Sequence, residues 1–130
     1  MSRNGQEIMK ATVNDLDKVV MEELDNFAGM LPGTIEEAQK TVAKTVVKQL
    51  KHDSPQRGKN KYAKGWRSTT TRTRTGAETV IYNGAQPGLV HLLEYGHPKV
   101  NGGRTREFVH VQPAEDKAVE LYTQTLERSI

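Results

Sequence analysis

The sequence contains no cysteine, which excludes disulfide bonds and catalysis by a thiol. The absence suits a reducing compartment such as the cytoplasm. Long hydrophobic runs are also missing, and no stretch approaches the ~20 apolar residues that a membrane-spanning helix needs. The first ten residues are polar. We therefore expect neither a secretory signal nor a membrane partner.

Aromatic residues are scarce. Only 5% of the 130 residues are aromatic and 35% are hydrophobic, whereas 27% are charged. This length fits a single domain, 1–130, with one modest core. A core this lean in apolar side chains is often completed by a neighbouring subunit. Trp66 is the only tryptophan, and we expect it to anchor the core together with Tyr62.

Charge is distributed unevenly along the chain, although the net charge is only +3. Residues 1–40 include four basic and eight acidic side chains, and residues 75–130 include five and seven. Between them, residues 41–74 include ten basic side chains and one acidic one. Such a basic block indicates a contact with nucleic acid, or a docking of one copy on the acidic flank of the next. The sequence leaves both interpretations open.

Helical periodicity dominates the first part of the chain, 1–53. Apolar residues that recur at steps of three or four predict a first helix that ends near Gly29. Its stripe consists of Val13, Leu16, Val20, Leu24 and Phe27. The alternative is a kink in one longer helix, because Met30 and Leu31 extend this stripe.

A second helix is predicted to start at Thr34. Glu37 follows three residues later, which indicates a capping box. The helix should stop before Pro55, because a proline disfavours helical backbone in the residue that precedes it. Its predicted inner face consists of Ile35, Ala38, Val42, Val46 and Leu50.

The second part of the chain, 54–130, predicts a sheet and a closing helix. From Tyr62 to Tyr82 the pattern alternates with a period of two, which indicates a hairpin that turns at Gly76. LVHLLEYG predicts a short helix, FVHVQP a third strand, and Pro113 the first turn of a final helix. The predicted inner face of this helix consists of Ala114, Ala118, Leu121, Thr125 and Leu126.

This order of elements predicts an α+β fold. It comprises N-terminal helices, a small antiparallel sheet with a short helix at one corner, and a C-terminal helix packed on the sheet.

The stretch LVHLLEYGHPKVNGG gathers two histidines and a glutamate, and His110 follows beyond a loop. A zinc site would use His91, Glu94 and His97. Their spacing argues against it, because helical zinc motifs place two histidines four apart or a glutamate beside the second histidine. We interpret His91, Glu94 and His97 as a structural corner. In it a buried Glu94 accepts hydrogen bonds from a histidine or from backbone N–H groups.

Other catalytic signatures are missing from the sequence. No serine lies in a Gly-x-Ser-x-Gly turn, and no glycine loop matches a phosphate-binding motif. We therefore predict no enzymatic activity, no catalytic residue and no metal. A metal-dependent hydrolase built on His91, Glu94 and His97 is the weakest of the hypotheses.

The stretch RGKNKYAKGWRS interleaves basic residues with two aromatic ones, as proteins that bind single-stranded nucleic acid do. For Trp66 we favour the competing interpretation as a core anchor. The sequence leaves open whether the basic residues bind nucleic acid. The alternative function is therefore a small nucleic-acid-binding module that uses the block from Lys44 to Arg74.

Three stretches in this order resemble the small neck proteins of tailed bacteriophages, described as head–tail joining, tail-completion or minor tail-component proteins. They are SPQRGKNKYAKGWRS, VIYNGAQPGLVHLLEYGHPKVNGG and FVHVQPAEDKAVE, and HLLEYGH is the most specific element. The resemblance spans about 54–118.

The resemblance implies a structural ring subunit without a cofactor, with sixfold symmetry favoured over twelvefold. It would lie in the virion neck, and in the host cytoplasm during assembly. Neighbouring neck, connector or tail proteins would be its partners. DNA would pass through the ring without sequence-specific binding.

Arg72 and Arg74 lie two residues apart, and such residues share one face of a strand, with Thr71, Thr73 and Thr75 opposite. A channel through which DNA slides should avoid tight phosphate contacts, since each adds affinity. We therefore predict that both arginines contact acidic residues of an adjacent subunit or ring.

Overall fold

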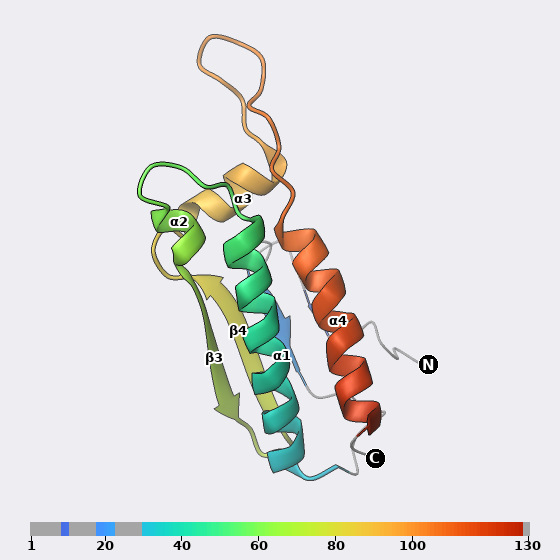
Figure 1. The fold of residues 1–130 in the computed structure, drawn as a ribbon. Helices are drawn as coiled ribbons and strands as arrows, with labels where there is room; N and C mark the ends of the chain where they lie inside the picture. The colour runs from blue at the N-terminus through green and yellow to red at the C-terminus, as the bar shows by residue number, and fades with distance from the viewer. Residues whose placement is uncertain (1–8, 11–17, 23–29, 129–130) are drawn as a thin grey trace, which may run out of the picture.

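A four-stranded antiparallel sheet and two long helices form the body of the protein (Figure 1). The computed structural model describes residues 9–10, 18–22 and 30–128. The elements in chain order are β1 (Met9–Lys10), β2 (Val19–Met21), α1 (Pro32–Asp53), α2 (Lys61–Lys64), β3 (Trp66–Arg72), β4 (Ala77–Asn83), α3 (Gly88–Tyr95) and α4 (Val111–Arg128). The α+β class predicted from the sequence is confirmed. No helix among the described residues is long and apolar enough to cross a bilayer.

The sheet has the strand order β1-β2-β4-β3, so the predicted hairpin of β3 and β4 occupies one side of it. Trp66 pairs with Asn83 and Arg72 with Ala77 across seven consecutive positions. Alternate residues of a strand point to opposite faces, and on β4 every second residue is buried, from Ala77 to Asn83. This alternation assigns one face of the sheet to the core.

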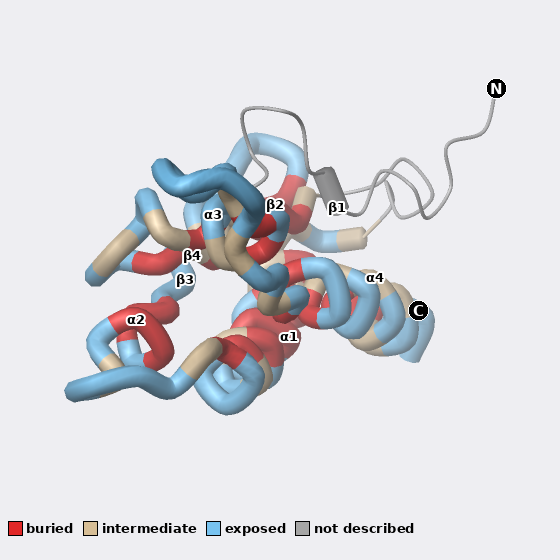
Figure 2. The backbone as a smooth tube through the Cα atoms, turned by 90° about the horizontal axis from the view of Figure 1, so that it is seen from above, coloured by how far each residue is buried: buried red, intermediate tan, exposed pale blue. Residues whose placement is uncertain are grey.

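Two helices cover that face, as predicted. Helix α1 contacts β3, β4 and α4, and α4 contacts β1. Figure 2 shows that the buried parts of α1 face the sheet and α4, whereas its exposed parts point away from them. The whole predicted inner stripe of α1 is buried: Ile35, Ala38, Val42, Val46 and Leu50.

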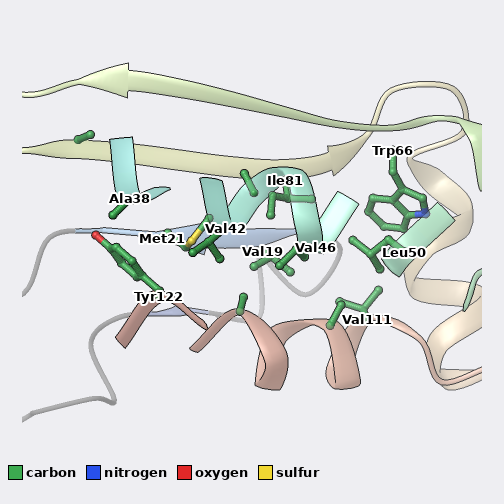
Figure 3. Close-up of a cluster of buried hydrophobic side chains, with 14 of the residues drawn as sticks. Val19, Met21, Ala38, Val42, Val46, Leu50, Trp66, Ile81, Val111 and Tyr122 are labelled. Carbon is green, nitrogen blue, oxygen red and sulfur yellow. The ribbon is translucent and has the colours of Figure 1, made fainter. Parts of the chain in front are cut away.

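The core runs along the space between sheet and helices (Figure 3). Trp66 is its largest side chain and is only 1% exposed. On α4 the predicted residues Ala114, Ala118 and Leu126 are buried, whereas Leu121 and Thr125 are half-buried. Tyr122, which the predicted inner face omitted, is fully buried. Burying an aromatic ring removes a large apolar area from water. Tyr122 therefore adds apolar area to a core that has few aromatic side chains.

A neutral polar network crosses the core between α1, β4 and α4. The amide nitrogen of Gln39 donates to the Ala77 carbonyl at 2.7 Å and to the Tyr122 hydroxyl at 2.9 Å. The Thr79 hydroxyl donates to the amide oxygen of Gln39 at 2.7 Å. Tyr122 in turn donates to the carbonyl of Glu22. Because each donor meets an acceptor, the network ties the three elements together at little cost in desolvation.

The predicted first helix is wrong where the structure describes it. Val19–Met21 is a strand that pairs with β4, with Val20 opposite Val80. Valine favours strands when it packs on neighbouring strands, and this tertiary contact overrides a helical spacing. The rest of the predicted stripe and the end near Gly29 lie outside the described residues.

Helix α1 begins earlier than predicted. Leu31 is the residue before the first turn, Pro32 opens the helix, and no side chain caps it. The capping box of Thr34 and Glu37 is therefore wrong. Proline suits the first helical position because its φ is fixed at a helical value and its missing N–H needs no partner there. The predicted stop before Pro55 is confirmed, since α1 ends at Asp53.

The predicted third strand at 108–113 is also wrong. Residues 105–110 have no regular structure, and α4 already begins at Val111. The backbone N–H groups that a strand would offer to a neighbour are instead bound by a side chain of α3. The short helix α2 was not predicted either.

Candidate functional site

Glu94 caps a helix to which it does not belong. It lies on α3 and is only 3% exposed. Its carboxylate accepts hydrogen bonds from the backbone N–H groups of His110 at 2.8 Å, Val111 at 2.9 Å and Gln112 at 3.0 Å. These N–H groups open α4, and the first N–H groups of a helix lack partners within it. The negative charge also complements the positive end of the helix dipole. Glu94 thereby fixes α3 to α4.

The environment of Glu94 keeps it ionised. Burial acts to raise the pKa of its carboxyl group. The hydrogen bonds from the His110 ring and from the three backbone N–H groups outweigh that effect and lower the pKa to about 2. A carboxylate that accepts several N–H groups is stabilised in its charged form.

His110 links Glu94 to Tyr62. Its Nδ1 lies 3.0 Å from a Glu94 oxygen and within hydrogen-bond distance of the Phe108 carbonyl. Both are acceptors, so we assign the ring proton to Nδ1. Its Nε2 lies 2.7 Å from the Tyr62 hydroxyl. Burial, and then the charge of Glu94, raise the pKa of Tyr62, so this hydroxyl keeps its proton and donates to Nε2.

Trp66 and Tyr62 lie at the centre of this end of the molecule. Their rings meet edge to face with centroids 5.8 Å apart. The Trp66 indole N–H donates to the Ser54 hydroxyl at 2.8 Å, which ties the start of β3 to the end of α1. Asn83 donates to the Tyr62 carbonyl at 2.8 Å. We call Ser54, Tyr62, Trp66, Asn83, Glu94 and His110 the corner network.

Two of the predicted corner residues lie outside this network. His91 is exposed, and its ring packs 4.9 Å from that of Tyr95. His97 binds Thr105, whose hydroxyl accepts the His97 backbone N–H at 2.9 Å. The histidine that Glu94 meets is His110. The cue for it in the sequence was faint, because His110 lies sixteen residues from Glu94.

The corner network offers little access to a ligand. Both oxygens of Glu94 already accept hydrogen bonds, and His110 is 1% exposed. Among the described residues, no group of three histidine, aspartate or glutamate side chains is placed to hold a metal ion. A surface groove lies at the start of α1, lined in part by Leu31, Pro32 and Glu37. Arg72 lines it too, and that residue lies at the opposite end of β3 from Trp66.

Residues 96–108 form an arm that projects beyond α3 and the body (Figure 1). Its base is closed by one hydrogen bond within the arm and tied to α3 by another. The Thr105 N–H donates to the His97 carbonyl, and the Phe108 N–H donates to the Leu93 carbonyl, both at 2.8 Å. Gly96 has a φ of +71°, and a Cβ there would lie 2.7 Å from the Thr105 carbonyl oxygen. Only glycine fits at this position, where the two limbs of the arm approach closely.

The tip of the arm is exposed. It closes with a hydrogen bond of 2.9 Å from the Lys99 N–H to the Gly103 carbonyl. Val100 is fully exposed at the tip. Further down, the guanidinium groups of Arg57 and Arg106 lie over the Phe108 ring, at 5.4 and 5.5 Å from its centroid. The base is therefore fixed by the body, and the tip presents one apolar side chain to the surroundings.

The two arginines predicted at an interface differ in their surroundings. Arg72 forms an ion pair with Glu36 on α1 at 2.8 Å, and the hydrogen bond from Arg72 lowers the pKa of Glu36. Arg74 lies in the turn after β3, because the strand ends at Arg72. The prediction that both share one strand face is wrong. Their contact with another subunit stays a prediction.

Comparisons with protein-family models, with curated proteins and with solved structures returned no match.

Proposed function

We propose that this chain is a structural subunit of a tailed-phage neck, one copy of a ring that joins head to tail. One observation carries the proposal. The three stretches that resemble neck proteins are separate segments of 54–120, and all three contribute to the corner network. Tyr62 comes from the first, Glu94 from the second and His110 from the third, and His110 contacts both of the others directly.

The contacts among the three stretches support the resemblance, because the quoted residues share one structural role. Glu94 caps α4, His110 bridges Glu94 and Tyr62, and Asn83 holds the Tyr62 carbonyl. These residues form one connected and buried unit. The unit holds the base of the arm, since α3 precedes the arm and α4 follows it.

In this proposal the arm contacts a neighbouring subunit or ring. A ring needs two different patches on each copy, one of which meets the other on the next copy. A projecting arm with an exposed apolar tip, Val100, supplies one such patch. The chain has no catalytic role and no cofactor here. Its partners are further copies, in a ring of six rather than twelve, and neighbouring neck, connector or tail proteins.

The experiment is a count of copies in assembled particles. Electron cryomicroscopy of purified virions that contain the chain should find it between head and tail, in a closed ring around the DNA passage. One or two copies per particle, or a location on the tail surface, would contradict the proposal.

A further inference from the structure

The solvent-facing side of α1 carries a row of lysines. Lys44, Lys48 and Lys51 follow one another at steps of four and three residues, so each lies one helical turn from the next. All three are exposed. By helical spacing the row lies opposite the buried stripe of α1. The exposed parts of α1 point away from the sheet (Figure 2).

Helix α2 adds two further exposed lysines near the end of α1. It contacts α1 and lies beside the end of α1 in Figures 1 and 2. Its two lysines, Lys61 and Lys64, are exposed while the residues between them are buried. We call Lys44, Lys48, Lys51, Lys61 and Lys64 the lysine face.

Little negative charge opposes the lysine face. Asp53 is the only acidic residue of the block 41–74, and it pairs with His52 at 2.9 Å. Glu36 and Glu37 lie at the other end of α1, where Glu36 binds Lys40 and Arg72. Within the described part of the chain, no lysine of the face lies within ion-pair distance of a carboxylate. The face is therefore free to bind an anionic partner.

The side-chain type indicates which anionic partner fits. Lysine is a hydrated point charge on a flexible stem, whereas arginine makes directed pairs with planar carboxylates and with phosphates. Rows of lysine at about 5–6 Å intervals along a helix suit a regular polyanion that is contacted through charge alone.

We propose that the lysine face binds the phosphate backbone of double-stranded DNA weakly and without sequence preference. In the neck, this face of the subunit would line the DNA passage. That location rests on the proposed function, whereas the binding itself does not. Loose lysine contacts reconcile attraction with sliding, since each contact exchanges readily with salt ions.

The test is fluorescence anisotropy of the full chain with a labelled duplex of arbitrary sequence at several salt concentrations. We expect measurable binding at low salt that weakens steeply as salt is added. The variant Lys44→Gln/Lys48→Gln/Lys51→Gln should bind at least about tenfold more weakly and lower the log–log salt slope by about three, near 0.9 per lost contact. A second duplex of unrelated sequence should bind equally well.

A matched control removes three positive charges elsewhere. Lys99→Gln/Arg104→Gln/Arg106→Gln lies on the arm and should leave the affinity within about twofold. The proposal is overturned if the parent does not bind at low salt, or if both triple variants weaken binding equally. Preferential binding of polyglutamate over DNA would overturn it as well, and would indicate an acidic protein partner. A correct ring in virions together with any of these outcomes would leave the proposed function intact.

Discussion

The two ends of the helix–sheet interface are both held by buried polar networks, but the networks differ in charge. At the end away from the arm, Gln39, Thr79 and Tyr122 exchange hydrogen bonds between neutral groups. At the arm end, the corner network has an ionised carboxylate, Glu94, which accepts three backbone N–H groups and meets His110. Both are fully satisfied, since the described residues include no buried side-chain N or O atom without a partner.

The difference shows where the fold depends on charge. Deleting one group from a neutral network costs about the free energy of one hydrogen bond. A buried carboxylate that caps a helix leaves several N–H groups unpaired when it is removed. The arm is therefore held by the more sensitive of the two networks.

Glu94→Ala should produce the largest loss. We expect about 3–5 kcal/mol of destabilisation, because three N–H groups, two of them buried, lose their acceptor and α4 loses its cap. The proposed assembly into particles should be lost with it. Urea denaturation measures the change. Glu94→Gln is the matched control, since it keeps the shape and one acceptor oxygen and should be less damaging. A free energy of unfolding that is unchanged in the alanine variant would contradict the capping role.

A fall in pH should weaken the corner network more than the neutral network. The pKa of Glu94 lies near 2 in the folded protein and near 4.5 in the unfolded chain. The stability it contributes, on the order of 3 kcal/mol, is therefore complete above about pH 4.5 and is lost as the pH falls towards 2. Denaturation curves at pH 6, 4 and 3 should reveal this loss. In Glu94→Gln the same pH range should cost less stability than in the parent, and an equal loss in both would contradict the assignment.

Gln39→Ala tests the neutral network. We expect a loss of about 1–3 kcal/mol, because the Ala77 carbonyl and the hydroxyls of Thr79 and Tyr122 lose a partner. This loss should be the same at pH 6 and pH 4, in contrast to that of Glu94→Ala. Tyr122→Phe, which removes only the hydroxyl, is the milder companion and should cost about 1 kcal/mol. A pH-dependent loss in Gln39→Ala would erase the distinction between the networks.

Much of the fold was predictable because local patterns and burial agree. The buried stripe of α1 and the hairpin of β3 and β4 followed from the periodicity of the sequence. The anchor Trp66 followed from its being the only tryptophan. Val19–Met21 was not predictable in this way, because its strand depends on pairing with β4, sixty residues away. The strand expected at FVHVQP failed for a similar reason, since a distant carboxylate binds its N–H groups.

The candidate site was predictable in part. Glu94 stood out because a lone carboxylate in an apolar helix needs a partner. Its partners are set by tertiary structure, so His110 replaced the nearer His91 and His97. Ser54 and Asn83 carried no distinctive pattern, and only the fold brings them to Trp66 and Tyr62.

Charge reversal at Arg72 and Arg74 should have a small effect on stability and a large one on assembly. The double variant Arg72→Glu/Arg74→Glu should stay folded, because the ion pair with Glu36 is at the surface. It should block the joining of heads to tails, which particle counts measure. Adding Glu36→Arg restores the pair within the chain. If that restores joining, Arg72 acts only within its own subunit and the interface assignment is wrong.

Val100→Asp should have the smallest effect on stability, since the side chain is fully exposed at the tip of the arm. We expect an unchanged Tm together with a loss of joining, because a charge replaces the apolar contact that we propose for the arm. Val100→Thr keeps the shape and should retain most activity in assembly. If the aspartate variant joins heads to tails normally, the arm tip does not lie in the interface. Only the base of the arm would then contribute to assembly.

The count of copies in the assembled particle tests the central claim most directly. Electron cryomicroscopy of virions, processed without imposed symmetry, should find this chain in a closed ring at the head–tail junction. We predict six copies, with the arm of each in contact with a neighbouring protein. A particle that lacks the chain, or that holds it in one or two copies, would contradict the account.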